Sequence, residues 1–405
     1  MTQPYSSGKL KSMKNSKLDI AQATIRTKNG KLYDLGEDSL VRKGINTLTD
    51  EQFLELFKRY RLRFDLTPRC NLWCIFCSNE GSNYSARCQK TLDIDLAIKL
   101  SDILIKNAGL RSIDFSGGEP TTHEDFVSGE YKLLKWTKTH PEVNFAIHSN
   151  GILLKPETVD LLKDTFSKIG ISLHSPNFET WNKLTNRNNG FPIEAQKRKF
   201  GQILSNIDHM VQLGIGHKVF VKSVIVRGYN DSEVELKSLL DFCAERGLHP
   251  KFFEFEPQYK DQEKYVVGRK EFFGRLKNIG CEFGPDAPFH NDPNTYIPGV
   301  NFQYKAKNGA QMGLHSIFGC GDKAACETCY IYLCAFVKAS EDGKGLYLKP
   351  CPVLDTRFDL TKAVKNGNMK QVMDIFKKSR EYLMLAPGMG IKDWNKEDEF
   401  KIDFC

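Results

Sequence analysis

The stretch Arg61–Gly81 has the sequence RLRFDLTPRCNLWCIFCSNEG, a short β-rich run followed at once by three cysteines. Cys70, Cys74 and Cys77 are spaced so that one loop can wrap three thiolates around one face of a small cluster. Thiolates favour iron–sulfur clusters or zinc. A zinc knuckle would need a fourth Cys or His nearby, and Cys88 is the candidate. Three ligands leave one metal position open for chemistry, so the spacing favours an open iron–sulfur cluster.

The β-rich character returns five more times along the chain, between segments whose apolar residues have helical spacing. The six predicted strands are Arg61–Leu66, Arg111–Ser116, Val143–Ser149, Lys168–Leu173, Lys218–Val226 and Pro250–Phe255. Helical patterns between them cover residues 92–108, 157–163, 203–212 and 232–246. Strands and helices that alternate in this way indicate parallel βα units.

Each predicted strand is followed by polar, glycine-bearing or cysteine-bearing sequence. In a βα barrel such loops surround one mouth and build the site, which fits this chain better than an open doubly wound sheet. Six strands are fewer than the eight of a closed barrel. We therefore predict an α/β fold, an incomplete (β/α)6 TIM-type barrel with a Cys-rich C-terminal extension for an auxiliary cluster.

Sequence character changes along the chain and predicts five regions. These are an N-terminal extension (1–59), the barrel (60–258), a connector without clear periodicity (259–319), an auxiliary-cluster region (320–356) and a C-terminal helix and tail (357–405). The fourth region contains a predicted hairpin with strands at 336–339 and 346–348 and Asp342-Gly343-Lys344 at the turn. The predicted C-terminal helix covers residues 366–384.

Composition limits the possible functions. The 405 residues include 40% hydrophobic and 27% charged residues, an ordinary globular balance that excludes wholesale disorder. A net charge of +8 suits an anionic ligand but is too small to indicate nucleic acid binding. We find neither a long uncharged apolar stretch nor a signal-peptide pattern, so we expect no membrane association and a cytoplasmic location. Many of the 12 cysteines fall in two tight clusters, which favours metal or redox chemistry over a disulfide framework.

The CxxxCxxC motif after the first strand of a βα barrel resembles the radical S-adenosylmethionine (radical SAM) superfamily. The resemblance implies that Cys70, Cys74 and Cys77 hold a 4Fe–4S cluster whose fourth iron binds SAM. It also implies cleavage of SAM to a 5′-deoxyadenosyl radical that abstracts hydrogen from a substrate. The GGEP, SNG and SLHS segments resemble the family's SAM-binding motifs, which implies SAM contacts at Gly117, Gly118, Glu119, Pro120, Ser149, Asn150 and Ser172.

From about Arg61 to Asp355 the chain is similar to the GTP cyclase that starts molybdopterin biosynthesis. Arg187 falls where that branch carries an arginine near SAM, and a solvated surface arginine is the alternative. The branch also holds an auxiliary 4Fe–4S cluster through a short hairpin. This implies a second 4Fe–4S cluster, with a ligand set drawn from Cys320, Cys326, Cys329, Cys334 and Cys351. We select the last four, while zinc remains the alternative metal.

Three departures from the cyclase pattern weaken the expectation of GTP cyclisation. Basic residues after its GEP motif are replaced by the acidic Thr121–Asp125 (TTHED), which would repel phosphates. Its two GTP-contacting arginines correspond to Phe336 and Lys338, and lysine replaces the bidentate arginine fork poorly. The chain ends in IDFC without the cyclase's Gly-Gly tail.

Several single residues are weaker candidates. His148 and His174 end predicted strands and could contact SAM or substrate, or be hydrogen-bonded structural histidines. Lys222 interrupts an apolar strand and needs an anionic partner. Glu254 and Glu256 could bind a substrate amine, but salt bridges are the favoured interpretation. The remaining cysteines are interpreted as non-ligands: Cys88, Cys243, Cys281 and Cys405.

We therefore predict a radical SAM enzyme acting on a small molecule, a nucleotide or sugar derivative, in a C–C bond formation, rearrangement or dehydrogenation. A low-potential electron donor such as flavodoxin or ferredoxin is the expected protein partner, with no nucleic acid and no membrane. The alternatives are GTP cyclisation, a peptide-modifying radical SAM enzyme, and a zinc-stapled binding module without catalysis.

Overall fold

The computed structural model describes most of the barrel and parts of both flanking regions. The described residues are 24–26, 32–34, 49–77, 90–255, 257, 260–283, 301–306, 311–317, 334–340, 342–351 and 356–385. The candidate residues named above that lie outside this set are Cys88, Glu256, Cys320, Cys326, Cys329 and Cys405.

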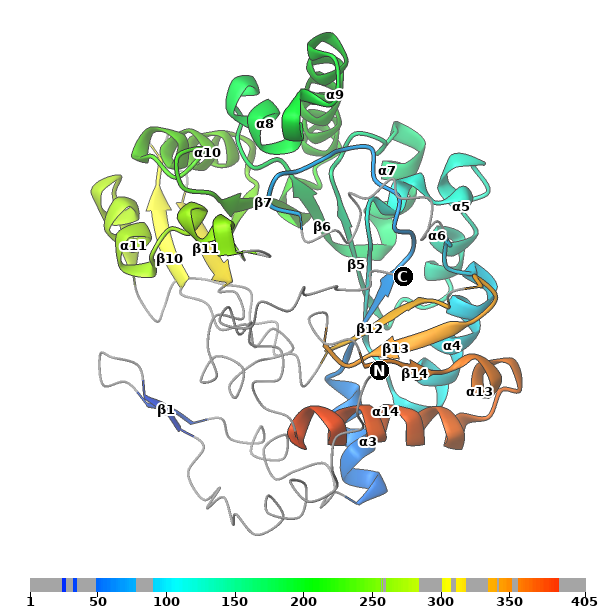
Figure 1. Ribbon diagram of the computed structural model, residues 1–405. Coiled ribbons are helices and arrows are strands. Elements are labelled where there is room, and N and C mark those ends of the chain that lie inside the picture. The colour runs from blue at the N-terminus through cyan, green and yellow to red at the C-terminus, as the bar shows by residue number, and fades with distance from the viewer. Residues whose placement is uncertain are drawn as a thin grey trace.

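Six parallel strands form the centre of one sheet, in chain order. They are β3 (Arg61–Asp65), β4 (Ser112–Ser116), β5 (Asn144–Ser149), β6 (Phe166–Ser172), β7 (Val219–Ile225) and β8 (His249–Glu254). All six predicted strands are present, and their observed ends lie within two residues of the predicted ones. Helices lie along the outer side of these strands (Figure 1), as the predicted βα units require.

Alternation along each strand separates an apolar outer face from a polar inner face. On β3, Leu62 and Phe64 are fully buried in the core beneath the helices, whereas Arg61 and Arg63 alternate with them. The same period continues on the other central strands, where Phe115, Phe145 and Ile169 face the helices. The core is therefore the layer between strands and helices, and the polar residues face the inside of the curved sheet.

Two more parallel strands extend the sheet, one at each side. β12 (Cys334–Ala339) pairs with β3, and β11 (Gln311–Ile317) pairs with β8. Antiparallel strands continue outward: β13 (Leu346–Lys349) and β14 (Phe358–Asp359) beside β12, and β10 (Asn301–Lys305) and β9 (Cys281–Phe283) beside β11. The strand order runs from β14 to β9 without the two edges pairing, so the barrel is open, as predicted. A separate hairpin joins β1 (Thr24–Arg26) and β2 (Leu32–Asp34).

The helices follow the predicted positions and add several that the sequence analysis did not identify. Their bounds are α3 Asp50–Lys58, α4 Ile94–Ala108, α5 Glu124–Val127, α6 Lys132–Thr137, α7 Pro156–Thr165, α8 Phe178–Thr185, α9 Ile193–Gln212, α10 Glu233–Arg246, α11 Arg269–Asn278, α13 Thr361–Lys365 and α14 Met369–Leu385. α14 confirms the predicted C-terminal helix and packs against α3, with Phe376 in an edge contact with Phe57 at 5.2 Å (Figure 1). Within the described ranges, no helix has both the length and the apolar character needed to cross a membrane.

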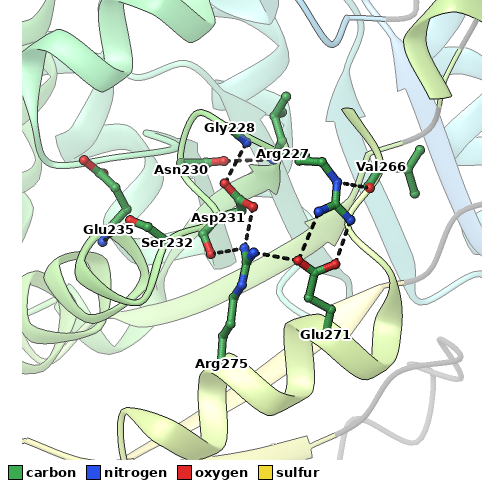
Figure 2. A network of polar contacts seen from close by, with 10 residues as sticks. Arg227, Gly228, Asn230, Asp231, Ser232, Glu235, Val266, Glu271 and Arg275 are labelled. Carbon is green, nitrogen blue, oxygen red and sulfur yellow. Dashed lines mark hydrogen bonds and ion pairs between the residues drawn. The ribbon is translucent and has the colours of Figure 1, made fainter. Parts of the chain in front are cut away.

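The segment 259–319 is more than the connector that we expected. It contains α11 and strands β9, β10 and β11, which lengthen the barrel sheet. Figure 2 shows why α11 docks: Glu271 on α11 accepts two hydrogen bonds from Arg227 in the loop after β7, at 3.0 and 2.6 Å. Arg275 joins Glu271 to Asp231 in the same loop. These long-range ion pairs leave no periodic pattern in the sequence, which is why the segment was misjudged.

Candidate active site: a cysteine loop at the barrel mouth

The predicted cysteine loop follows β3 and is fixed along the C-terminal end of α8 and the residues after it. Trp73 N–H donates to Thr185 O at 3.0 Å, and Ile75 N–H donates to Leu184 O at 2.9 Å. Arg187 donates from Nη2 to the carbonyl oxygens of Cys74 and Ile75, at 3.0 and 3.1 Å. The Arg187 guanidinium is therefore hydrogen-bonded to the backbone of the cysteine loop, so Arg187 is not a solvated surface side chain. Its contact with SAM stays a prediction.

Two glycines of GGEP let the cysteine loop lie directly against the end of β4. Gly118 N–H donates to Thr67 O at 2.7 Å, and Glu119 N–H donates to Arg69 O at 2.7 Å. A Cβ on Gly118 would stand 2.3 Å from Arg69 O, and one on Gly117 would stand 2.6 Å from Thr67 O. Gly117 also has φ of 122°, where a side chain is strained. The close approach therefore explains the glycine pair.

Glu119 ties the loop after β4 to the loop after β5. Its buried carboxylate accepts hydrogen bonds from the Thr121 N–H and hydroxyl, from Ser149 Oγ at 2.8 Å and from Asn150 N–H at 2.6 Å. Burial raises the pKa of Glu119, and these hydrogen bonds oppose the rise. Pro120 begins a short 3-10 turn (Pro120–Thr122). The carboxylate is therefore positioned by protein donors of both loops.

Asn150 lies over the first cysteine. Its Nδ2 is 3.9 Å from Cys70 Sγ and donates to Asn71 Oδ1 at 2.6 Å. Ser149 Oγ also accepts from Gly151 N–H at 2.9 Å, so Ser149 fixes the turn that presents Asn150. Ser172 is half-buried at the end of β6 and pairs in register with Lys222 of β7.

The three thiols gather beside two cationic side chains. Burial raises the pKa of Cys70 to about 12 and that of Cys74 well above its usual range. Cys77 adds to the rise at both thiols, and Cys70 adds to the rise at Cys74. Arg187 and Lys199 oppose this rise at Cys74, because their positive charges favour a thiolate. Lys199 on α9 also donates to Asn71 O at 2.8 Å.

This donor set fits an iron–sulfur cluster. Three soft sulfur ligands share one loop, two cations offset their charge, and the glycine pair admits close backbone approach. Among the described residues, no three His, Cys, Asp or Glu side chains converge as ligands of a single metal ion. Cysteines of a four-iron cluster bind separate iron atoms, so such a cluster does not need that convergence.

Comparison with known proteins supports the family resemblance. The model of the radical SAM superfamily matches residues 64–240, which contain the cysteine loop, GGEP and Arg187. This region, less than half of the chain, is similar to the radical SAM superfamily. Its relatives include the GTP 3',8-cyclase of Paenarthrobacter nicotinovorans, 30% identical over 48% of this chain and 51% of the cyclase. The GTP 3',8-cyclase of Sulfurovum sp. (strain NBC37-1) is 25% identical over 78% of this chain and 86% of the cyclase. The matches to several of these curated relatives span little more than half of their length.

A solved structure supports the fold alone. Streptococcus suis SuiB, solved with its precursor peptide SuiA, aligns with a TM-score of 0.53 at 14% identity, covering 81% of this chain and 71% of SuiB. The family match and the GTP 3',8-cyclase relatives support the expected enzyme class, for which a 4Fe–4S cluster and SAM are the implied cofactors.

A polar network covers part of the inner face of the barrel. Asp114 on β4 accepts from His148 Nε2 at 3.1 Å and lies 3.7 Å from Arg61 Nε. Burial alone would raise the pKa of Asp114, but Arg61 and His148 outweigh burial and hold it below its usual range. Burial also lowers the pKa of His148 to about 3, so the imidazole is neutral. Sequence analysis singled out His148 but missed Asp114, although the alternating pattern SIDFS places it on the inner face.

His174 is held in a strained conformation beside the cysteine loop. Its φ is 65°, its ring lies 4.4 Å from the ring of Phe76, and its Nδ1 accepts from Val224 N–H at 3.2 Å. The side chain of Asn230 donates to His174 O at 3.1 Å, and Asn230 belongs to the loop shown in Figure 2. Strain of this kind clusters at functional sites. His174 therefore has a structural hydrogen bond, and its ring also packs on the cysteine loop.

Two predicted auxiliary ligands are described and two are not. Cys334 and Cys351 are buried at the open ends of the β12–β13 hairpin. The register pairs Phe336 with Lys349, so the same register continued by two residues places Cys334 opposite Cys351. Cys334 lies beside Arg61, at the end of β3 away from the cysteine loop. Cys326 and Cys329 lie outside the described residues.

The acidic segment after GGEP has mainly structural contacts. His123 Nδ1 accepts from Asp125 N–H at 3.1 Å, and the carboxylate of Asp125 accepts from Lys132 and Leu133 N–H at the start of α6. Glu124 is exposed and lies 3.9 Å from Arg69. Of the two acidic residues expected to repel phosphate, Asp125 is therefore bound to backbone N–H groups at the start of α6. Of the presumed non-ligand cysteines, Cys243 and Cys281 are buried in the hydrophobic core.

Proposed function

We propose that this protein cleaves SAM reductively and uses the radical to abstract hydrogen from a small anionic molecule, a nucleotide or sugar derivative. The product would arise by C–C bond formation, rearrangement or dehydrogenation. The observation that supports this most directly is the arrangement of the cysteine loop, which lies on the glycine pair with Asn150 against Cys70.

In this proposal Cys70, Cys74 and Cys77 bind three irons and leave the fourth for SAM. When bound, the cluster supplies the electron that breaks a carbon–sulfur bond of SAM. Lys199 and Arg187 favour the thiolate state of the ligands and hold the loop backbone. The segment Gly117–Pro120 is adjacent to the loop, and its buried Glu119 favours an ammonium group such as that of SAM.

Polar side chains of the neighbouring strand ends would orient the rest of SAM. Ser149 and Asn150 come from the loop after β5, and Ser172 ends β6. Because these elements are adjacent in the sheet, their polar groups lie around one part of the barrel mouth. Arg187 acts from the loop side, as a positioning residue for Cys74 and Ile75.

The charge of the inner face supports an anionic substrate. The basic residues at inner-face positions of β3, β6, β7, β8 and β12 are Arg61, Arg63, Lys168, Lys222, Lys251 and Lys338. The carboxylates of the same face in β3 and β4 are Asp65, paired with Lys338 at 2.9 Å, and Asp114. An excess of positive charge in a confined space favours negatively charged ligands.

We further propose a second 4Fe–4S cluster at the opposite end of the barrel, held by Cys326, Cys329, Cys334 and Cys351. The facing positions of Cys334 and Cys351 support this assignment. The reducing electron would come from a low-potential donor such as flavodoxin or ferredoxin in the cytoplasm.

Anaerobic reconstitution tests the proposed function. We expect a brown protein with about eight irons per chain, as two four-iron clusters require, and dithionite-dependent formation of 5′-deoxyadenosine. A colourless protein with stoichiometric zinc and no 5′-deoxyadenosine would contradict the proposal and favour a zinc-stapled binding module.

GTP cyclisation is the second candidate, because the curated relatives cited above carry that name. The contacts of Phe336 and Lys338, which stand where the cyclase has its two GTP-contacting arginines, oppose GTP cyclisation. Phe336 lies under the guanidinium of Arg63, 5.6 Å from Cζ to the ring centre, and Lys338 pairs with Asp65 at 2.9 Å. Incubation with GTP, SAM and dithionite decides between them: we expect no GTP-dependent increase in 5′-deoxyadenosine and no cyclised nucleotide.

A further inference from the structure

Two neighbouring lysines face the inside of the barrel, and neither forms an ion pair with a carboxylate of the described residues. Lys222 on β7 and Lys251 on β8 are register partners and are half-buried. Phe253 lies near both, with its ring centre 5.9 Å from Lys222 Nζ and 5.5 Å from Lys251 Nζ. A cation–π contact of that length offsets only part of what an ammonium group loses on leaving water.

His148 presents a lone pair beside Lys222. Its Nε2 bonds the carboxylate of Asp114 at 3.1 Å, which places the ring proton on Nε2 and leaves Nδ1 as an acceptor. Nδ1 is buried and receives no hydrogen bond within the part of the chain that the structure describes. A buried acceptor without a donor is costly, so Nδ1 fits a ligand that carries a hydroxyl or amine.

The space beside Gly170 shows that His148 Nδ1 and Lys222 Nζ lie close to the same position of β6. A Cβ on Gly170 would stand 2.8 Å from His148 Nδ1 and 3.1 Å from Lys222 Nζ. His148 Nδ1 and Lys222 Nζ therefore both lie next to Gly170 of β6. Lys251 of β8 is the register partner of Lys222 and lies beside them. A side chain at position 170 would displace both groups, so glycine is required for their approach.

The surrounding charges favour an anion. Burial, together with Arg61, Arg63 and the neighbouring lysines, lowers the pKa of Lys251 to about 7 and that of Lys222 well below its usual range, while Asp114 opposes the change. The inner-face charges closest to the pair are thus mainly positive. A bound oxyanion would offset the desolvation of both side chains and favour their protonated state.

We propose that Lys222, Lys251 and His148 form a subsite for an oxyanion group of the substrate and the hydroxyl beside it. The lysines donate to the oxyanion, and His148 Nδ1 accepts from the hydroxyl. This subsite rests on the proposed radical SAM function and gives its substrate a chemical class, the hydroxylated phosphates and carboxylates. Sugar phosphates and sugar acids belong to that class.

Three small probes test the subsite on the reconstituted full-length protein: glycerol 3-phosphate, glycerate and glycerol. We expect calorimetry to show that one of the two anions binds at least tenfold more tightly than glycerol, and which one it is separates phosphate from carboxylate. Lys222→Met and Lys251→Met should each weaken that binding about tenfold or more, the size expected for a hydrogen bond to a charged group. Lys163→Met, at a solvent-accessible position of α7, should leave it unchanged.

Gly170→Ala should weaken anion binding as well, because it displaces both groups without removing either. Anion affinity equal to that of glycerol, or unchanged by both lysine substitutions, would overturn the subsite. A loss of SAM affinity in Lys222→Met would also overturn it, because Lys222 would then serve SAM bound at Ser172.

Two further measurements separate the subsite from a structural role and from the underlying function. Lys222→Met should raise the unfolding temperature, because it removes a poorly compensated buried charge, whereas a fall would assign Lys222 a structural ion pair and overturn the subsite. The control variant Lys163→Met should still form 5′-deoxyadenosine from SAM and dithionite without substrate. Wild-type protein that forms none would refute the proposed function, whatever the anion measurements show.

Discussion

Gly118→Ala is a small change with a large expected effect, because the cysteine loop leaves no space for a methyl group. The new Cβ would stand 2.3 Å from Arg69 O and 2.7 Å from Pro68 O, both backbone atoms. Relieving this overlap means moving the loop, at a cost of about 1–3 kcal/mol for overpacking. Moving the loop also weakens the hydrogen bonds from Gly118 N–H and Glu119 N–H, each worth about 1 kcal/mol.

A shift of about 3 kcal/mol would leave roughly one molecule in a hundred with the loop in its native position. We therefore expect Gly118→Ala to lose most of the iron at the first cluster and nearly all 5′-deoxyadenosine formation. Gly201→Ala on α9 is the matched control, because a Cβ there has no neighbour within 4 Å. Gly201→Ala should keep the iron of the first cluster and the formation of 5′-deoxyadenosine, and it should stabilise the helix by about 0.5–1 kcal/mol. Iron analysis after anaerobic reconstitution and chromatography of 5′-deoxyadenosine measure these effects. Wild-type iron and SAM cleavage in Gly118→Ala would refute the assignment of the loop.

Three further predictions concern residues around the mouth. Arg187→Met should destabilise the cysteine loop by about 1.5–3 kcal/mol for each charged hydrogen bond lost. Arg187→Lys should restore little of this stability, because lysine lacks the guanidinium fork. The retention of iron during dialysis against a chelator measures the stability of the loop in both variants. Asp114→Asn should lower the free energy of unfolding by about 3–5 kcal/mol at pH 7, since it breaks a buried ion pair. Because the pKa of Asp114 is lowered in the folded state, its stabilisation is present above the unfolded pKa of about 3.9 and is lost as the pH falls below it. Urea unfolding should therefore show that the difference in unfolding free energy between wild type and Asp114→Asn shrinks below about pH 4. A difference that does not change with pH would contradict the ion pair of Asp114 with Arg61. Glu119→Gln should place an amide N–H against the donor groups of Asn150 or Ser149 and weaken SAM binding about tenfold or more, measured by calorimetry.

The sequence predicted the strands well because each carries its own signal. In RLRFD the apolar residues alternate with charged ones, and the structure buries Leu62 and Phe64 under the helices. The spacing of the three cysteines likewise needed no distant information. In contrast, the pairing of β12 with β3 joins Cys334 to Arg61 across most of the chain, and no local pattern encodes it. The α11 region was missed for the same reason, since ion pairs from Arg227 and Asp231 hold it in place.

In the candidate site, too, residues with a local sequence signal could be predicted, and residues brought together only by the fold could not. Lys199 was missed because it is one of many charged residues on an amphipathic helix, and only the fold brings its ammonium group to Asn71. Lys251 and Asp114 had a usable signal, since charged residues at alternate strand positions predict an inner face. The contact of Asp125 with the start of α6 was not predicted, because Asp125 lies within α5, seven residues before Lys132.

Electron paramagnetic resonance tests the central claim most directly, in a variant with Cys326, Cys329, Cys334 and Cys351 all changed to alanine. The dithionite-reduced variant should show one four-iron cluster whose spectrum changes when SAM is added, because an iron not bound by cysteine accepts the new ligand. A spectrum identical with and without SAM, in a variant that retains the iron of one cluster, would contradict the claim that three cysteines leave a site for SAM.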